Sequence, residues 1–217
     1  RAIEKDPADA DLWLIRGVVR RGRGDLEGAI ADYGKALELR PDYVAAWYNR
    51  GNARRESGDP EGAARDFGAA IDLDPTEPDA YNNRGVLRRE AGDLQGALAD
   101  FDRLVELDPG RAAGHARRGE VRLELGDPTG AVQDLGAAID LDPDDLDAYQ
   151  ERSRAWLESG DPARAVADLD VVVERAPSAA AHYNRAIARH ALGDHEGELA
   201  DLTASLELEP GDARAHS

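Results

Sequence analysis

Residues 44–75 read VAAWYNRGNARRESGDPEGAARDFGAAIDLDP, and this stretch decides the fold. Its first half contains no proline and ends at Gly58-Asp59, and its second half begins at Pro60 and ends before Pro75. Glycine commonly closes a helix, and proline is tolerated at the first position of the helix that follows. Apolar residues of the second half recur at helical spacing. The stretch therefore predicts two short helices joined by a tight turn.

The same pattern recurs along the chain with a period of 34 residues. Prolines stand at positions 7, 41, 75, 109, 143 and 177, and a Gly-Asp pair recurs in the same register. Six repeats follow from this period: residues 10–43, 44–77, 78–111, 112–145, 146–178 and 179–212. One helix pair is marginal alone and needs its neighbours to cover its apolar stripe. We therefore expect an all-α solenoid of six antiparallel helix pairs.

The ends of the chain continue the repeat pattern. Residues 1–9 align with the tail of a preceding repeat, and residues 213–217 resemble the start of a further first helix. Methionine is absent, even at position 1, so we expect the 217 residues to be a piece of a longer protein. Apolar residues of the last helix would then lie uncovered, which favours either a continuing chain or self-association.

Composition excludes several classes of protein. The net charge of −18 argues against nucleic acid or an anionic membrane as the main partner. No apolar run is long enough to span a membrane, and no signal peptide opens the chain. The compartment stays open, with the cytoplasm favoured. Cysteine is absent, so no disulfide or thiolate metal site can form. Arginine greatly outnumbers lysine, which suggests a GC-rich bacterial genome.

The repeat resembles the bacterial-type tetratricopeptide repeat (TPR). Within residues 44–77, Trp47, Gly51, Ala63, Phe67 and Pro75 fall on signature positions of that family. The resemblance covers the six repeats and implies a right-handed superhelix in which the first helices line a concave groove. Members of the family bind many different partners, so the resemblance alone names none.

Two charged positions depart from the family pattern in every repeat. Counted from the first residue of each repeat, position 7 is always arginine and position 23 is always aspartate. In an antiparallel helix pair these positions lie at similar height, so we expect a ladder of internal ion pairs, although a charged binding stripe is the alternative. The expected pairs are Arg16–Asp32, Arg50–Asp66, Arg84–Asp100, Arg118–Asp134, Arg152–Asp168 and Arg185–Asp201.

The resemblance also implies which positions face the groove, and these differ between repeats. Arginine recurs at position 12 of repeats 1–3 among asparagine and tyrosine, whereas later repeats offer glutamate and a more apolar face. Arginine binds carboxylates, and asparagine can grip a peptide backbone. The candidate groove residues are Arg21, Tyr48, Asn49, Asn52, Arg55, Asn82, Asn83, Arg89, Glu120, Glu124 and Tyr183.

These features predict a non-catalytic scaffold that binds an extended peptide or a helix in its groove. Because the cationic positions lie in repeats 1–3, we expect the partner to present an acidic segment there. The alternative is a regulatory module, sensing a ligand or partner, within a larger enzyme or transcriptional regulator. A catalytic or signalling domain in the flanking sequence would favour that alternative.

The histidines give no catalytic or metal motif. His115 and His182 fall on the bulky packing position 4 of their repeats. His190 and His195 flank the last turn, but their spacing matches no metal-binding motif. Glu198 replaces the alanine of the other five repeats, and we expect it to push the helices apart or to turn outward. The sequence thus predicts no catalytic residue, no metal and no cofactor.

Overall fold

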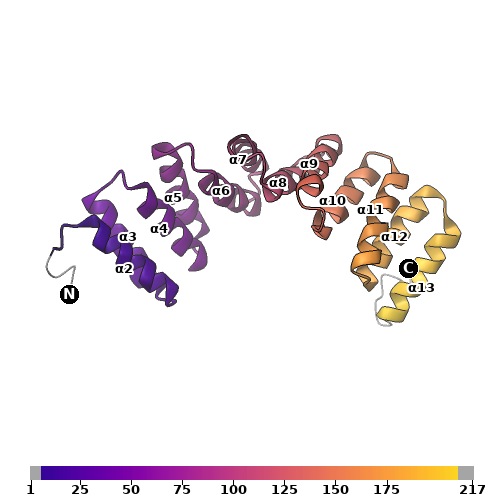
Figure 1. The fold of residues 1–217 in the computed structure, drawn as a ribbon, viewed down its shortest axis with the longest axis horizontal. Helices are drawn as coiled ribbons and strands as arrows, with labels where there is room; N and C mark the ends of the chain where they lie inside the picture. Colours follow the sequence, from indigo (N-terminus) through magenta and orange to yellow (C-terminus); the bar gives the residue numbers. More distant parts are fainter. Residues whose placement is uncertain (1–5, 210–217) are drawn as a thin grey trace. The chain divides into compact units, whose positions relative to one another are not determined.

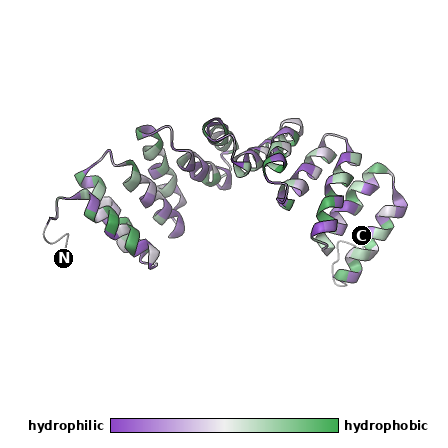
Figure 2. Ribbon diagram, viewed as in Figure 1, coloured by the Kyte–Doolittle hydropathy of each residue, from purple (hydrophilic) through white to green (hydrophobic). Residues whose placement is uncertain are grey.

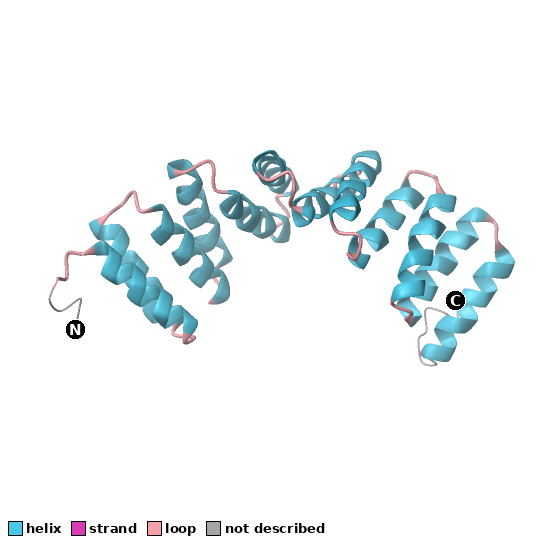
Figure 3. Ribbon diagram, viewed as in Figure 1, coloured by secondary structure: helices cyan, strands magenta, loops and turns pink. Residues whose placement is uncertain are grey.

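The computed structural model describes residues 6–209, and within them the chain consists of helices and short connections without strands (Figures 1 and 3). Two compact units divide the chain, Arg1–Asp108 and Pro109–Ser217. The N-terminal unit holds α2 (Ala10–Gly22), α3 (Leu26–Leu39), α4 (Val44–Glu56), α5 (Pro60–Leu73), α6 (Pro78–Glu90) and α7 (Leu94–Leu107). The C-terminal unit holds α8 (Ala112–Glu124), α9 (Pro128–Leu141), α10 (Leu146–Glu158), α11 (Pro162–Arg175), α12 (Ala179–Leu192) and α13 (His195–Leu208). The predicted all-α fold is confirmed.

Consecutive helices pair, and each pair lies within one of the six ranges that the period delimits. Within each unit the second helix of one pair also packs against the first helix of the next, as α3 does against α4 and α9 against α10. Of the expected tail at residues 1–9, residues 6–9 are described and form a turn before α2. The further helix expected at 213–217 lies outside the described residues.

The Gly-Asp turn within each pair has the predicted form. Its glycines have φ between 79° and 83°, a left-handed conformation that costs glycine little and other residues more. The next aspartate caps the second helix, as Asp59 does by accepting a hydrogen bond from the backbone N–H of Gly62 at 2.8 Å. The turn therefore closes one helix and opens the next within a few residues.

The core of each helix pair is thin and consists of alanine around one larger side chain. Position 20 is a fully buried alanine in the first five repeats, and position 24 is an equally buried aromatic or leucine. Hydrophobic and hydrophilic residues share every helix, as amphipathic packing requires (Figure 2). The larger buried side chains at position 24 are Tyr33, Phe67, Phe101, Leu135 and Leu169.

An aromatic side chain at position 24 restricts the residue that faces it from the first helix. A Cβ added to Gly51 would lie 2.9 Å from Cε1 of Phe67, so the buried ring leaves no room for one. All three repeats with an aromatic residue at position 24 have glycine at position 8. Leucine at position 24 occurs with either choice: repeat 4 has Gly119, whose added Cβ would lie 2.8 Å from Leu135 Cγ, whereas the last two repeats carry Ser153 and Ala186 at position 8.

Two glycine-to-alanine changes should therefore have opposite effects on stability. Gly68 lies within α5, where an added Cβ would have only Arg84 Nη1 as a near neighbour, at 3.6 Å. Gly68→Ala should stabilise the chain by about 0.5–1 kcal/mol through helix propensity. Gly51→Ala should destabilise the chain, because overpacking the core costs about 1–3 kcal/mol, which exceeds the gain in helix propensity. Urea unfolding followed by circular dichroism tests the order, and a more stable Gly51→Ala would contradict it.

Candidate binding groove and internal ion pairs

All six arginine–aspartate pairs of the expected ladder lie within hydrogen-bonding distance. In each repeat the guanidinium donates from Nε to Oδ2 and from Nη2 to Oδ1 of the aspartate. The Nη2–Oδ1 distances are 2.6–2.7 Å, and every one of these aspartates is buried. Two parallel hydrogen bonds to a carboxylate form the strongest geometry that arginine offers.

A second arginine, at position 11, contacts the same aspartate in five repeats. In repeat 2, Arg54 Nη1 lies 2.8 Å from Asp66 Oδ1, and the other four contacts have the same length. Repeat 5 has Trp156 at this position, and the guanidinium of Arg164 lies 4.6 Å from its ring centroid. One buried carboxylate thus fixes two arginines of the first helix in most repeats.

The position 7 arginines also contact other parts of the repeat array. The Arg50 guanidinium lies 4.6 Å from the ring centroid of Trp47, on the preceding turn of α4. Between repeats 5 and 6, Arg185 Nη1 donates to Asp170 of the preceding repeat at 2.8 Å. Sequence reasoning missed this contact between repeats, although the change from glycine to aspartate at position 25 was a visible signal.

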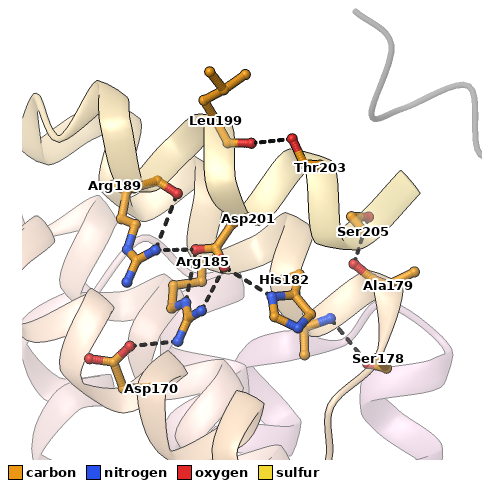
Figure 4. Close-up of polar contacts among 12 residues, drawn as sticks. Asp170, Ser178, Ala179, His182, Arg185, Arg189, Leu199, Asp201, Thr203 and Ser205 are labelled. Carbon is orange, nitrogen blue, oxygen red and sulfur yellow. Dashed lines mark hydrogen bonds and ion pairs between the residues drawn. The ribbon is translucent and has the colours of Figure 1, made fainter. Parts of the chain in front are cut away.

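The last repeat shows the arrangement in detail (Figure 4). Asp201 of α13 accepts hydrogen bonds from Arg185 and Arg189, and His182 Nδ1 lies 2.9 Å from its Oδ1. Burial raises the pKa of Asp201, but the hydrogen bonds from Arg185 and His182 outweigh it and leave the pKa below its ordinary value. Every donor in this cluster comes from α12, so the cluster ties the two helices together.

The contribution of this buried carboxylate should depend on pH. A depressed pKa means that stabilisation is complete above the unfolded pKa, about 3.9, and is lost as the pH falls through the folded value. The parent chain should therefore be more stable than Asp201→Asn at neutral pH, and the difference should shrink in acid. Urea unfolding of both chains at several pH values tests this, and comparing the two cancels the effect of overall charge. A constant difference down to strongly acidic pH would contradict it.

The groove residues of repeats 2 and 3 form a polar network between α4 and α6. Asn83 is buried, and its Nδ2 donates to the Tyr48 hydroxyl at 3.2 Å and to Asn52 Oδ1 at 3.4 Å. Arg55 Nη1 lies 3.5 Å from Asn83 Oδ1, while the rest of its side chain is exposed. Asn52 and Asn83 were expected to bind a peptide backbone. Both side chains are instead buried, and they bond to each other between α4 and α6.

Of the three arginines at position 12 of repeats 1–3, which were expected to face a partner, Arg21 forms an ion pair within the chain. Its guanidinium donates to Glu56 of the next repeat, with Nη2 2.6 Å from Oε1. The hydrogen bond from Arg21 in turn lowers the pKa of Glu56. The charge of Arg21 is therefore matched by a carboxylate of the next repeat.

A hollow of about 300 Å³ lies beside this network. Val44, Ala45, Tyr48 and Asn49 of α4 line one side, and Glu77 and Asp79 line the other. Of the lining residues, Tyr48 and Asn49 were expected in the groove, and the carboxylates were not. Glu77 caps α6 by accepting from the Asp79 backbone N–H at 3.2 Å, a role that its place before Pro78 could have suggested.

The C-terminal unit has a second hollow, of about 310 Å³, between α10 and α12. It is lined by Gln150, Glu151, Ser153, Arg154, Leu157, Leu169, Asn184 and Ile187. Of the candidate residues in this unit, Glu124 is exposed, while Glu120 and Tyr183 are half-buried, and none of the three lines the hollow. Ile187 is 45% exposed, so this groove presents an apolar side chain to solvent.

The geometry defines a class of protein, an array of helical repeats. Two hollows are lined mainly by residues of its first helices, and each buried aspartate pairs with arginine of the same repeat. A family model described as "Tetratricopeptide repeat" matches residues 48–112, 117–180 and 154–213, and one described as "TPR repeat" matches residues 17–58. The chain belongs to the tetratricopeptide repeat family. Proteins of this family are typically non-catalytic modules for protein–protein interaction, and neither the family matches nor the similar structures indicate a catalytic fold.

Several solved structures share this fold. A crystal structure of MamA is 25% identical, with a TM-score of 0.73, and the match covers 76% of this chain and 90% of MamA. PilF of Pseudomonas aeruginosa is 18% identical with a TM-score of 0.73 over 98% of this chain and 97% of PilF. YrrB, described as having an unusual peptide-binding site, is 20% identical with a TM-score of 0.69 over 99% and 94%. Among curated proteins, none matches this chain in sequence.

Across residues 6–209, none of the helices combines the length and the apolar character needed to cross a membrane.

Proposed function

We propose that the chain is a scaffold that binds an extended peptide or a helix along its first helices, with an acidic segment of the partner at repeats 1–3. The hollow beside Tyr48 and Asn49 carries this proposal, because it adjoins the network that holds the exposed Arg55. YrrB, which shares the fold, is described as having a peptide-binding site, which supports a peptide as the ligand.

The chemistry of the hollow fits a peptide backbone beside a carboxylate. Glu77 and Asp79 offer acceptors to backbone N–H groups, and Val44 and Ala45 offer a small apolar surface. Arg55 offers a guanidinium fork to an Asp or Glu side chain of the partner. On a chain of net charge −18, this local cationic position selects acidic segments over the rest of the surface.

A random peptide library displayed on phage and selected on the immobilised chain tests this assignment. We expect the selected peptides to be enriched in Asp and Glu, and to bind more weakly above about 0.1–0.2 M salt because surface charges are screened. The variant Arg55→Glu/Arg89→Glu should lose these peptides while keeping its helical circular dichroism spectrum. Arg65→Glu, at an exposed arginine of the second helix α5, is the matched control and should retain them.

The selection also separates the two hollows. Peptides that survive the double reversal but are lost in Ile187→Glu would place the binding site in repeats 5 and 6 and overturn the assignment. Selected peptides without an acidic bias would equally contradict it.

We further propose that the chain self-associates through its end helices. Ile15, Val18 and Val19 form an exposed apolar face on α2, and Leu199 of α13 is 67% exposed. Sedimentation velocity over a range of concentrations should show oligomers that Leu199→Glu abolishes. A parent chain that stays monomeric at every concentration would exclude this proposal.

A further inference from the structure

The last turn of the chain brings together three side chains that the other repeats lack. His190 lies in the last turn of α12 at position 12, His195 begins α13 at position 17, and Glu198 stands at position 20. The first five repeats have arginine or leucine at position 12, leucine or proline at position 17, and alanine at position 20. Three departures from the repeat pattern thus coincide at one point, although the repeat framework needs none of them.

Glu198 does not separate the two helices, as one expectation held, but turns outward to both histidines. His190 Nδ1 lies 3.0 Å from Oε1 of Glu198, and His195 Nδ1 lies 3.1 Å from Oε2. The two imidazole rings meet edge to face with centroids 5.9 Å apart. One potential ligand atom from each residue lies within 4.8 Å of the other two.

We propose that His190, His195 and Glu198 form a binding site for a divalent transition-metal cation of the zinc type. Ligands of a tetrahedral zinc ion, held at about 2.0–2.2 Å, lie about 3.3–3.6 Å from one another. The two nitrogen–oxygen distances, 3.0 and 3.1 Å, are slightly shorter than this spacing, and the exposed imidazoles can adjust by rotation. Two imidazoles with one carboxylate suit zinc, nickel or copper, whereas calcium and magnesium favour oxygen ligands alone.

The backbone holds these ligands in a fixed arrangement. Gly193 joins the two helices with φ of 82°, and Asp194 caps α13 by accepting from the Gly197 backbone N–H at 3.0 Å. Asp194 Oδ2 also lies 3.7 Å from Arg189 Nε, so this nearby carboxylate is engaged. A metal ion would therefore link the end of α12 to the start of α13 across a turn that is already closed.

The site is open to solvent. The His190 and His195 side chains are 68% and 75% exposed, whereas that of Glu198 is 24% exposed. Three protein ligands leave at least one coordination position for water or for a group from a partner, as in zinc sites that are not purely structural. The negative charge of the chain favours accumulation of a cation near this turn.

Calorimetric titration of the untagged chain with zinc chloride at about pH 7.5, above the usual imidazole pKa of about 6.5, tests the proposal. We expect one bound zinc ion per chain and a zinc-dependent rise in melting temperature. Glu198→Ala is the decisive variant, because it removes a ligand and restores the alanine that the other five repeats have at this position. We therefore expect this variant to fold. Loss of an outer-shell partner of a metal site costs about 10–100-fold in affinity, so loss of a ligand should cost at least about tenfold.

His190→Ala and His195→Ala should weaken binding in the same way. Glu196→Ala is the matched control: it removes a carboxylate from the same turn of α13 that is outside the cluster, and it should leave zinc affinity unchanged. A parent chain that binds no zinc at millimolar concentration would overturn the proposal. Zinc binding that persists in all three ligand variants would also overturn it, because the ligands would then lie elsewhere.

Discussion

Replacing Asp66 by alanine should lower the free energy of unfolding by about 2–4 kcal/mol. Asp66 is buried and holds Arg50 and Arg54 at 2.7 and 2.8 Å, so its loss leaves two guanidinium groups without their carboxylate. The side chains of Arg50 and Arg54 are 15% and 24% exposed. Partial access to water places the cost below the ~3–5 kcal/mol of a fully buried pair.

Asp72→Ala is the matched control for this change. Asp72 lies on the same helix, α5, but its side chain is exposed, so its removal should alter stability by no more than about 0.5 kcal/mol. Urea unfolding of both variants gives the comparison, and hydrogen exchange should locate the extra opening in repeat 2. If the two variants unfolded at the same urea concentration, the buried pairs would not stabilise the fold, and the charged-stripe alternative would gain support.

Phe67→Ala should cost about 3–5 kcal/mol, because it empties a fully buried site. Its ring fills the space between Gly51 on α4 and Ala63 on its own helix, and the thin core of this repeat has few large side chains to collapse into the cavity. Each repeat is stabilised by its interfaces with neighbouring repeats. The loss of protection in hydrogen exchange should therefore extend beyond repeat 2.

The effect of Gly51→Ala on stability should change sign when the Phe67 ring is removed. Gly51→Ala is expected to destabilise the parent, because its Cβ meets the Phe67 ring, but to stabilise the Phe67→Ala background, where the ring is gone and helix propensity remains. A double-mutant cycle on the two residues measures this coupling. Additive effects of the two changes would show that the ring moves aside and that its size is not the reason for glycine at position 8.

The turn, the helix pair and the core of each repeat could be predicted from the sequence, because each depends only on residues within one repeat. Gly58, Asp59 and Pro60 encode the turn through backbone conformation and capping, which depend on residues within a few positions. The arginine–aspartate pairs were predictable for a related reason. Two positions 16 residues apart on an antiparallel pair must lie side by side, so a constant pairing of opposite charges indicates contact.

The groove was predicted less well, because its side chains belong to different repeats. Whether Asn83 faces solvent depends on how α6 packs against α4, and that packing buries it against Tyr48. The pairing of Arg21 with Glu56 joins residues 35 positions apart, in different repeats, and the same spacing of arginine and glutamate recurs in the sequence at Arg55 and Glu90 and at Arg89 and Glu124. Exposure and partners at such positions follow from the angle between neighbouring pairs, which a single repeat does not encode.

By itself, the sequence determined the repeat length, the helix pairs, the turns and the partner of each buried aspartate, because these depend on spacing within one 34-residue unit. Only the tertiary structure decided which groove residues are available, where the hollows lie, and that His190, His195 and Glu198 meet at the last turn. The physical reason is distance: helical geometry fixes neighbours a few residues apart or across one tight turn, whereas contacts between repeats depend on how their side chains pack.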